Sequence, residues 1–156
     1  DFIKSFEIAI QLGAILAGSR DKLISDFGVF GENLGLAFQI QDDILGVFGE
    51  EDVLGKSNKS DIEEGKNTLL IVEALKNANN LEMRVLRKYY GKGKISDKAL
   101  SKIRQIFIST RALDYAQKQA QKYITTAKKT IPKITKDAKS SVLLEQMAQY
   151  LVERNN

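Results

Sequence analysis

Two adjacent carboxylates stand out as residues able to do chemistry. Asp42 and Asp43 follow a strongly apolar stretch, and Gln39 and Gly46 lie at spacings of three and four around them. On a helix these positions share one face. Neighbouring carboxylates that lose hydration repel each other and require positive charge nearby. A hard divalent cation with oxygen ligands could supply it, and so could a lysine.

Four lysines are candidates for that positive charge. Three lie in or at the end of the segment after the carboxylates and one lies in the first expected helix: Lys56, Lys59, Lys66 and Lys4. Carboxylates, a divalent cation and lysines together form a diphosphate site, because the metal bridges carboxylate and phosphate oxygens while lysines neutralise the remaining charge. The pair alone is weak support for a metal site, since Asp-Asp on a helix is usually solvated.

The composition removes several other kinds of site. The 156 residues include no cysteine and no histidine. Disulfides, zinc–thiolate sites, cysteine nucleophiles, His-ligated metals and Ser-His-Asp catalysis are therefore excluded. Hydrophobic residues make up 43% and charged residues 28%, which is typical of a globular protein. Any metal must be held by oxygen, which favours Mg²⁺.

The elements that position these residues are expected to be helices. Apolar residues recur at helical spacing along most of the chain, and there is a single proline. Three glycines at helical spacing in the second helix, Gly28, Gly31 and Gly35, predict close approach of another helix. The fold class is thus all-α. Helices are expected over residues 2–17, 20–48, 67–77, 80–90, from 97 to Pro132, which interrupts, and from 137 onwards, with loops at 49–65 and 91–94.

Charge is divided unevenly along the chain. Residues 1–66 carry 13 acids and 6 bases, whereas residues 67–156 carry 7 acids and 18 bases. The bases are mainly lysines spread along helix faces without an arginine cluster, so binding to nucleic acid is not expected. The most apolar stretch, at 2–18, contains charged residues, so no membrane span is expected.

Residues 35–45, Gly-Leu-Ala-Phe-Gln-Ile-Gln-Asp-Asp-Ile-Leu, resemble the second aspartate-rich region of trans-type polyprenyl diphosphate synthases, such as farnesyl and geranylgeranyl diphosphate synthases. Four further segments resemble motifs of this family in the same order. They are Lys4-Ser5 with residues 13–18, Phe27-Gly28 before the aspartates, the segment from Leu54-Gly55-Lys56 through Ser60-Asp61-Ile62 to 64–69, and the C-terminal helix at 144–154.

The resemblance implies an all-α helical bundle of the isoprenoid synthase type and a head-to-tail prenyl transfer. In that reaction an allylic diphosphate ionises, and isopentenyl diphosphate attacks the resulting cation. The cofactor would be Mg²⁺. The resemblance also implies a role for each matching residue. Asp42 would ligate the metal, and Asp43 would support it. The diphosphate would be held by Lys4, Lys56 and Lys66, and Arg154 would approach it. Gln39 would form a hydrogen bond near the reacting end, and Phe38 would line the isopentenyl pocket.

Two departures from the family pattern shape the interpretation. The family motif often reads DDxxD, but position 46 is glycine here, so the third carboxylate is absent. A first aspartate-rich motif with adjacent arginines is also absent. Residues 1–156 are therefore expected to be the C-terminal half of such an enzyme, inactive alone. Helix faces that pack on the N-terminal half should be exposed and apolar.

Two alternatives to a working prenyltransferase remain. One is a non-catalytic helical partner or regulatory subunit that keeps the diphosphate-binding wall. The other is a terpene cyclase, which shares the fold but needs an Asn/Asp, Ser and Glu metal triad that is not evident around Asp42 or Asp61. The family resemblance further implies a homodimer, and the lysine-rich composition without cysteine favours a cytoplasmic location. Product length and the allylic substrate are not predicted, because the residues that set them lie in the other half.

Overall fold

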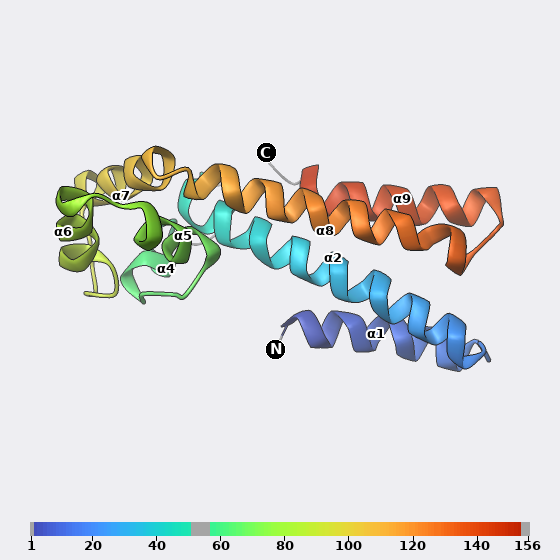
Figure 1. The fold of residues 1–156 in the computed structure, drawn as a ribbon. Helices are drawn as coiled ribbons and strands as arrows, with labels where there is room; N and C mark the ends of the chain where they lie inside the picture. Colours follow the sequence, from blue (N-terminus) through green and yellow to red (C-terminus); the bar gives the residue numbers. More distant parts are fainter. Residues whose placement is uncertain (1, 51–56, 154–156) are drawn as a thin grey trace. The chain divides into compact units, whose positions relative to one another are not determined.

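The computed structural model describes residues 2–50 and 57–153, with residues 2 and 151–153 in backbone only. The described residues form helices and no strand (Figure 1), which confirms the all-α prediction. The helices are α1 (Phe2–Leu16), α2 (Asp21–Phe48), α4 (Ser60–Glu63), α5 (Leu69–Asn77), α6 (Asn80–Tyr89), α7 (Asp97–Ser109), α8 (Ala112–Ile134) and α9 (Ala138–Glu153).

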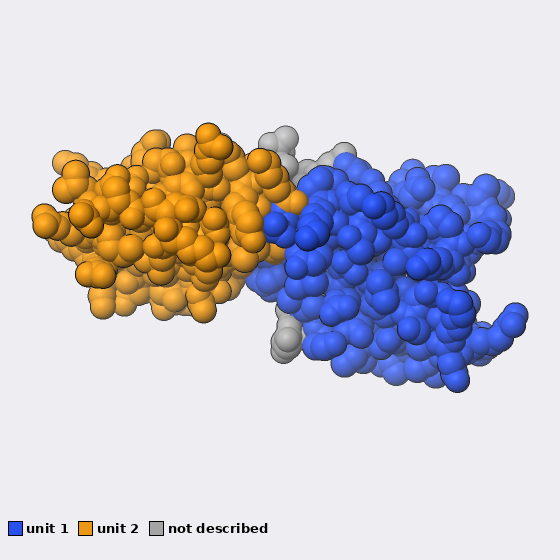
Figure 2. All heavy atoms as spheres, viewed as in Figure 1, with its two compact units in different colours: residues 1–39, 119–154 blue, residues 40–118, 155–156 orange. Residues whose placement is uncertain are grey.

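The chain divides into two compact units, coloured separately in Figure 2. Unit 1 contains residues 1–39 and 119–154, and unit 2 contains residues 40–118 with the last two residues. The helices α2 and α8 each contribute to both units. The division falls between Gln39 and Ile40 on α2, so Gln39 belongs to unit 1, whereas Asp42 and Asp43 belong to unit 2.

The core of unit 1 joins α2, α8 and α9. Its fully buried members follow helical spacing: Phe30, Leu34 and Ala37 on α2, Ile124, Ala127 and Ile131 on α8, and Ala148 on α9. Phe6 and Ile10 of α1 pack against this cluster. An apolar stripe of this kind holds a helix to its neighbours, because each buried aliphatic side chain contributes about 1.5–3 kcal/mol.

Three glycines of α2 face α1, as their spacing predicted. A Cβ atom at Gly31 would lie 3.2 Å from the Cα atom of Glu7, and one at Gly35 would lie 3.3 Å from the Cα atom of Ile3. At Gly28 the added atom would collide with the side chain of Gln11. A side chain at Gly31 or Gly35 would therefore press on the backbone of α1, and the predicted close approach of the two helices is confirmed.

Substituting Gly31 with valine should lower the free energy of unfolding by about 1–3 kcal/mol, because the new methyl groups would press on the backbone of α1. The matched control is Gly13→Ala on α1, where nothing lies within 4 Å of the added carbon. That change should raise stability by up to about 1 kcal/mol through helix propensity. Urea unfolding of the full-length protein measures both, and equal stability of the two variants would contradict the close approach.

Apolar side chains remain exposed on two helices of unit 1. On α1, Ile8, Leu12, Ile15 and Leu16 are between 50% and 88% exposed. On α9, Val142, Leu143, Met147 and Tyr150 are between 43% and 68% exposed. Exposed apolar faces are therefore present on unit 1.

Unit 2 is held by helix caps and by contacts between α2, α6 and α7. Asn79 caps α6, because its Oδ1 atom accepts hydrogen bonds from the N–H groups of Leu81 and Glu82. Glu82 completes a capping box by accepting from the N–H of Asn79 at 2.9 Å. Ser96 caps α7. These caps satisfy N–H groups that a helix start leaves open.

The end of α2 is anchored by α7. The Nε atom of Arg104 on α7 donates to the carbonyl oxygen of Val47 at 2.6 Å. The ring of Phe48 lies 6.5 Å from that of Phe107, centroid to centroid. Carbonyls in the last turn of a helix lack partners within the helix. Arg104 therefore supplies a donor one turn beyond Asp42 and Asp43 and fixes the end of the helix that carries them.

Two predicted helix boundaries were wrong. The expected long helix after residue 97 ends at Ser109 and restarts at Ala112, because Arg111 adopts a left-handed backbone with φ of 58°. Pro132 does not interrupt α8 but lies within it, close to its end. There the loss of one N–H donor costs a single hydrogen bond, which the last turn tolerates. Within the described residues, no helix is both long and apolar enough to cross a bilayer.

Candidate functional site

The carboxylate pair lies on the last two turns of α2, where the two side chains have different surroundings. Asp43 is buried, with 8% of its surface exposed, whereas Asp42 is half-buried. The helix positions them as the spacing predicted, and the buried Ile40, Ile44 and Val47 hold this part of α2 in unit 2. Burial removes hydration from the Asp43 carboxylate, so a cation must compensate it.

Lys66 supplies that cation. Its Nζ atom donates to Oδ1 of Asp43 at 2.8 Å and lies 3.4 Å from Oδ2 of Asp61. Asp61 is on α4 and is only 6% exposed. One lysine therefore joins a carboxylate of α2 to a carboxylate of α4. Partial burial lowers the pKa of Lys66, but its hydrogen bond to Asp43 and the attraction of both carboxylates outweigh this, so the pKa is raised above 10.5.

The segment that carries Asp61 and Lys66 is hydrogen-bonded to the turn at 91–94. The N–H of Gly91 donates to the carbonyl oxygen of Ile62 at 2.8 Å, and the N–H of Gly93 donates to that of Glu63 at 3.2 Å. Gly65 and Gly91 both have positive φ, and a Cβ atom on Gly65 would lie 2.8 Å from the Cα atom of Gly91. Only glycine fits this contact, so the two turns are built to touch.

Tyr90 adds a contact that sequence analysis missed. Its hydroxyl donates to the backbone oxygen of Lys66 at 2.5 Å. The pKa of Tyr90 is raised to about 12, mainly by burial and also by the nearby charges of Asp61 and Asp43. The hydroxyl therefore stays protonated and able to donate at neutral pH. Its position just before Gly91 placed it at a helix end, but no local pattern linked it to Lys66.

The other predicted residues are distributed as follows. Lys4 lies on α1 in unit 1, where its Nζ atom is 2.7 Å from Oε2 of Glu7. Phe38 and Gln39 lie half-buried on α2, also in unit 1. Lys56 and Arg154 lie outside the described residues. The structure brings Asp43 and Lys66 together, while the roles of all these residues remain predictions.

Lys59, one of the four candidate lysines, pairs with a carboxylate of α7. Its Nζ atom lies 2.7 Å from Oδ1 of Asp97, and its side chain is only 23% exposed. The hydrogen bond from Lys59 lowers the pKa of Asp97, which lies in the first turn of α7. Lys59 therefore ties the residue before α4 to the start of α7. This position makes it a structural contact of the segment that carries Asp61.

The donor set suits a magnesium ion that carries phosphate ligands of its own. Among residues 2–50 and 57–153, no three acidic, histidine or cysteine side chains are grouped to hold a metal by themselves. Mg²⁺ is usually bound by one or two carboxylates together with water and substrate phosphates, and seldom by a cage of protein ligands alone. Asp42 and Asp43 are hard oxygen donors of this kind, so the residues present fit the ion.

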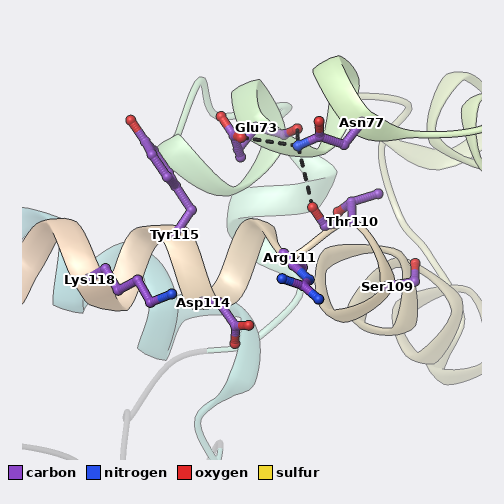
Figure 3. Close-up of a pocket in the computed structure, with 8 residues that line it drawn as sticks. All are labelled: Glu73, Asn77, Ser109, Thr110, Arg111, Asp114, Tyr115 and Lys118. Atoms are coloured by element: carbon purple, nitrogen blue, oxygen red, sulfur yellow. Dashed lines mark hydrogen bonds between the residues drawn. The ribbon is translucent and has the colours of Figure 1, made fainter.

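A hollow in unit 2 lies beside α5 and the turn between α7 and α8 (Figure 3). It has a volume of about 440 Å³ and is lined by acidic and basic side chains, among them Glu73, Arg111, Asp114 and Lys118. The Nδ2 atom of Asn77 donates to Oε1 of Glu73 at 3.0 Å and to the carbonyl oxygen of Thr110 at 3.4 Å. The hydrogen bond to Thr110 joins α5 to the turn between α7 and α8, so the hollow lies where these two elements are held together.

Comparison with known proteins places the chain in a family. The model of the polyprenyl synthetase family matches residues 4–107, which include most of α1, the carboxylate pair, Asp61 and Lys66. The chain therefore belongs to the polyprenyl synthetase family.

Individual relatives agree with this assignment. The chain is 38% identical over 149 residues to a geranylfarnesyl diphosphate synthase of Aeropyrum pernix, covering 95% of this chain and 46% of that protein. It is 35% identical over 152 residues to a geranylgeranyl diphosphate synthase of Sulfolobus acidocaldarius, covering 96% of this chain and 45% of the relative. The chain thus spans less than half the length of these relatives.

Solved structures show the same fold. A polyprenyl synthase from Caulobacter crescentus, complexed with calcium and isoprenyl diphosphate, matches with a TM-score of 0.87 and 29% identity over 97% of this chain and 46% of that one. A geranylgeranyl pyrophosphate synthase from Corynebacterium glutamicum, complexed with isoprenyl diphosphate and magnesium, matches with a TM-score of 0.85 and 28% identity over 92% of this chain and 41% of that one. The helical fold is therefore that of isoprenyl synthases.

Proposed function

We propose that the full-length protein is a Mg²⁺-dependent prenyltransferase that condenses isopentenyl diphosphate with an allylic diphosphate, head to tail, in isoprenoid biosynthesis. This chain would supply the wall that carries the second aspartate-rich motif. The observation that carries the proposal is the pairing of Asp43 with Lys66 beside Asp42 on the last turns of α2, in a member of the polyprenyl synthetase family. An N-terminal half with the first aspartate-rich motif would complete the enzyme.

The chain's residues would act mainly on the leaving diphosphate. Bound Mg²⁺ would neutralise charge on the diphosphate oxygens. Asp42 would hold the ion with its carboxylate, and Asp43, fixed by Lys66, would support the ion directly or through water. Because Lys66 already bonds two carboxylates, it keeps this wall from carrying two uncompensated buried charges. Positioned charge of this kind stabilises a developing diphosphate anion.

The remaining predicted residues would bind the two substrates. Lys4 and Lys56 would bind the allylic diphosphate, and Lys66 would lie near the same group. Gln39 would donate a hydrogen bond near the reacting end, and Phe38 would line the pocket beside the isopentenyl unit. The allylic C–O bond breaks with its electrons leaving on diphosphate, the isopentenyl double bond attacks the allylic cation, and a proton leaves to restore a double bond. A dry pocket protects the cation from water.

The direct test is an incorporation assay on the full-length protein. Labelled isopentenyl diphosphate is mixed in turn with C5, C10 and C15 allylic diphosphates, with Mg²⁺ or with a chelator. We expect label in an organic-extractable product with at least one allylic partner, no incorporation with chelator, and none from the 156-residue chain alone. No incorporation with all three partners would refute the proposal, and retained binding of Mg²⁺ and diphosphate would then support a non-catalytic binding subunit. The homodimer and the cytoplasmic location stay predictions.

A further inference from the structure

Gly46 leaves a space on α2 that another element fills. It is buried one turn after Asp43, on the same helix face. A Cβ atom built at this position would lie 2.7 Å from Oδ2 and 3.2 Å from Cγ of Asp61. Such a contact is too short for a real side chain, since buried atoms pack at van der Waals distance. The Asp61 carboxylate can therefore occupy this space only because residue 46 is glycine, and any side chain at position 46 would have to displace Asp61.

Asp61 reaches this space from a different part of the chain. It lies on α4, fifteen positions after Gly46, and it is 6% exposed. Its Oδ2 atom, the atom nearest to Gly46, is also the atom 3.4 Å from Nζ of Lys66. Lys66 in turn donates to Asp43. A carboxylate thus stands against α2 one turn after Asp43, although α2 itself carries none there.

We propose that Asp61 supplies from α4 the carboxylate that α2 lacks at position 46, and that it positions Asp43 by sharing Lys66 with it. Its effect on catalysis rests on the function proposed above. Asp61 is a positioning residue, because it acts through Lys66 and Asp43. Two buried carboxylates that share one ammonium group restrain that group, since leaving either without the cation is costly. Lys66, restrained by its contact with Asp61, keeps the Asp43 carboxylate in one orientation.

The surrounding contacts are consistent with a fixed carboxylate. The carbonyl oxygen of Ile62, the residue after Asp61, accepts from the N–H of Gly91 at 2.8 Å. The carboxylate of Glu63 accepts from the N–H of Ile95 at 2.9 Å. Lys59, two residues before Asp61, is paired with Asp97. The short helix α4 is thus held at both ends by neighbouring elements, so Asp61 is presented to α2 by a constrained backbone.

The test exchanges the carboxylate between the two positions. In the full-length protein, Gly46→Asp alone should displace Asp61, and Asp61→Gly alone should leave Lys66 with one partner. The double variant G46D/D61G returns a carboxylate to the same space from α2. The matched control G46N/D61G restores the shape without the charge. Residues in contact of this kind show non-additive effects, which a double-mutant cycle measures.

Two readouts separate this inference from the proposed function. The first is the free energy of unfolding in urea without metal or substrate, which needs no activity. The second is turnover, with kcat and KM measured separately. We expect both single variants to lose stability and G46D/D61G to recover it. We also expect each single variant to lower kcat by about 10- to 100-fold with little change in KM, because misplacing a catalytic group acts on the transition state.

A conservative variant guards against simple misfolding. Asp61→Asn keeps the size of the side chain and removes its charge, so we expect normal folding with kcat lowered about tenfold or more. Asp61→Asn with normal kcat would overturn the positioning role, as would equal kcat for G46D/D61G and G46N/D61G. Failure of G46D/D61G to recover stability over the single variants would overturn the spatial exchange. If the wild-type protein transfers no prenyl group, the proposed function fails, and the unfolding cycle still decides the exchange.

Discussion

Replacing Asp42 with alanine should lower the turnover of the full-length protein by about two to three orders of magnitude while leaving its stability nearly unchanged. Removing one group that stabilises developing charge commonly costs that much in kcat. Asp42 is half-buried on the last turns of α2, so its loss should change the free energy of unfolding by no more than about 1 kcal/mol. Steady-state incorporation of isopentenyl diphosphate and urea unfolding measure the two quantities.

The control for Asp42 is Asp21→Asn, which removes an exposed negative charge from the start of the same helix. It should leave turnover as in the wild-type protein and change the free energy of unfolding by no more than about 1 kcal/mol, through the helix dipole. Turnover of Asp42→Ala that equals the wild type at saturating Mg²⁺ would remove Asp42 from the metal site. Asp43→Ala should behave differently from Asp42→Ala, because it also deprives Lys66 of its shortest hydrogen bond, and it should therefore lose stability as well as turnover.

Replacing Lys66 with methionine should destabilise the protein by about 1–3 kcal/mol, the largest stability effect that we expect from a single charge. Methionine keeps the apolar stem but removes the ammonium group, and two buried carboxylates, Asp43 and Asp61, lose their shared cation. Breaking a buried pair in this way is costly, and the partial exposure of Lys66 reduces the cost. Urea unfolding at neutral pH gives the value.

Lys76→Met is the matched control, because Lys76 forms an exposed pair with Glu73 one turn away. Exposed pairs contribute about 0–1 kcal/mol, so this variant should be close to wild type. The pKa of Lys66 is raised above 10.5 in the folded protein. Its contribution is therefore fully present below pH 10.5 and is lost as pH rises through the folded pKa, so the difference between wild type and Lys66→Met should narrow above pH 10.5. Equal losses for the two variants would contradict a buried role for Lys66.

Local sequence patterns predicted most helices but missed features without a local signal. The apolar spacing of Phe30, Leu34 and Ala37 predicted a buried face of α2, and these residues do form the core of unit 1. The break after α7 was missed because it depends on Arg111 with positive φ, where sequence patterns favour glycine or asparagine. The proline signal at Pro132 was misleading because a helix tolerates proline when few turns follow it.

The candidate site likewise combines features that follow from local sequence with features that depend on tertiary contacts. The sequence determined by itself that Asp42, Asp43 and Gly46 share one face of a helix, because helical spacing is a local property. It also determined, through its ordered motifs, the family to which the chain belongs. Only the tertiary structure decided that Lys66 bonds Asp43 and Asp61, and that Asp61 fills the space beside Gly46. These contacts join residues on separate elements, and their partners are selected by packing and burial, which no local pattern records.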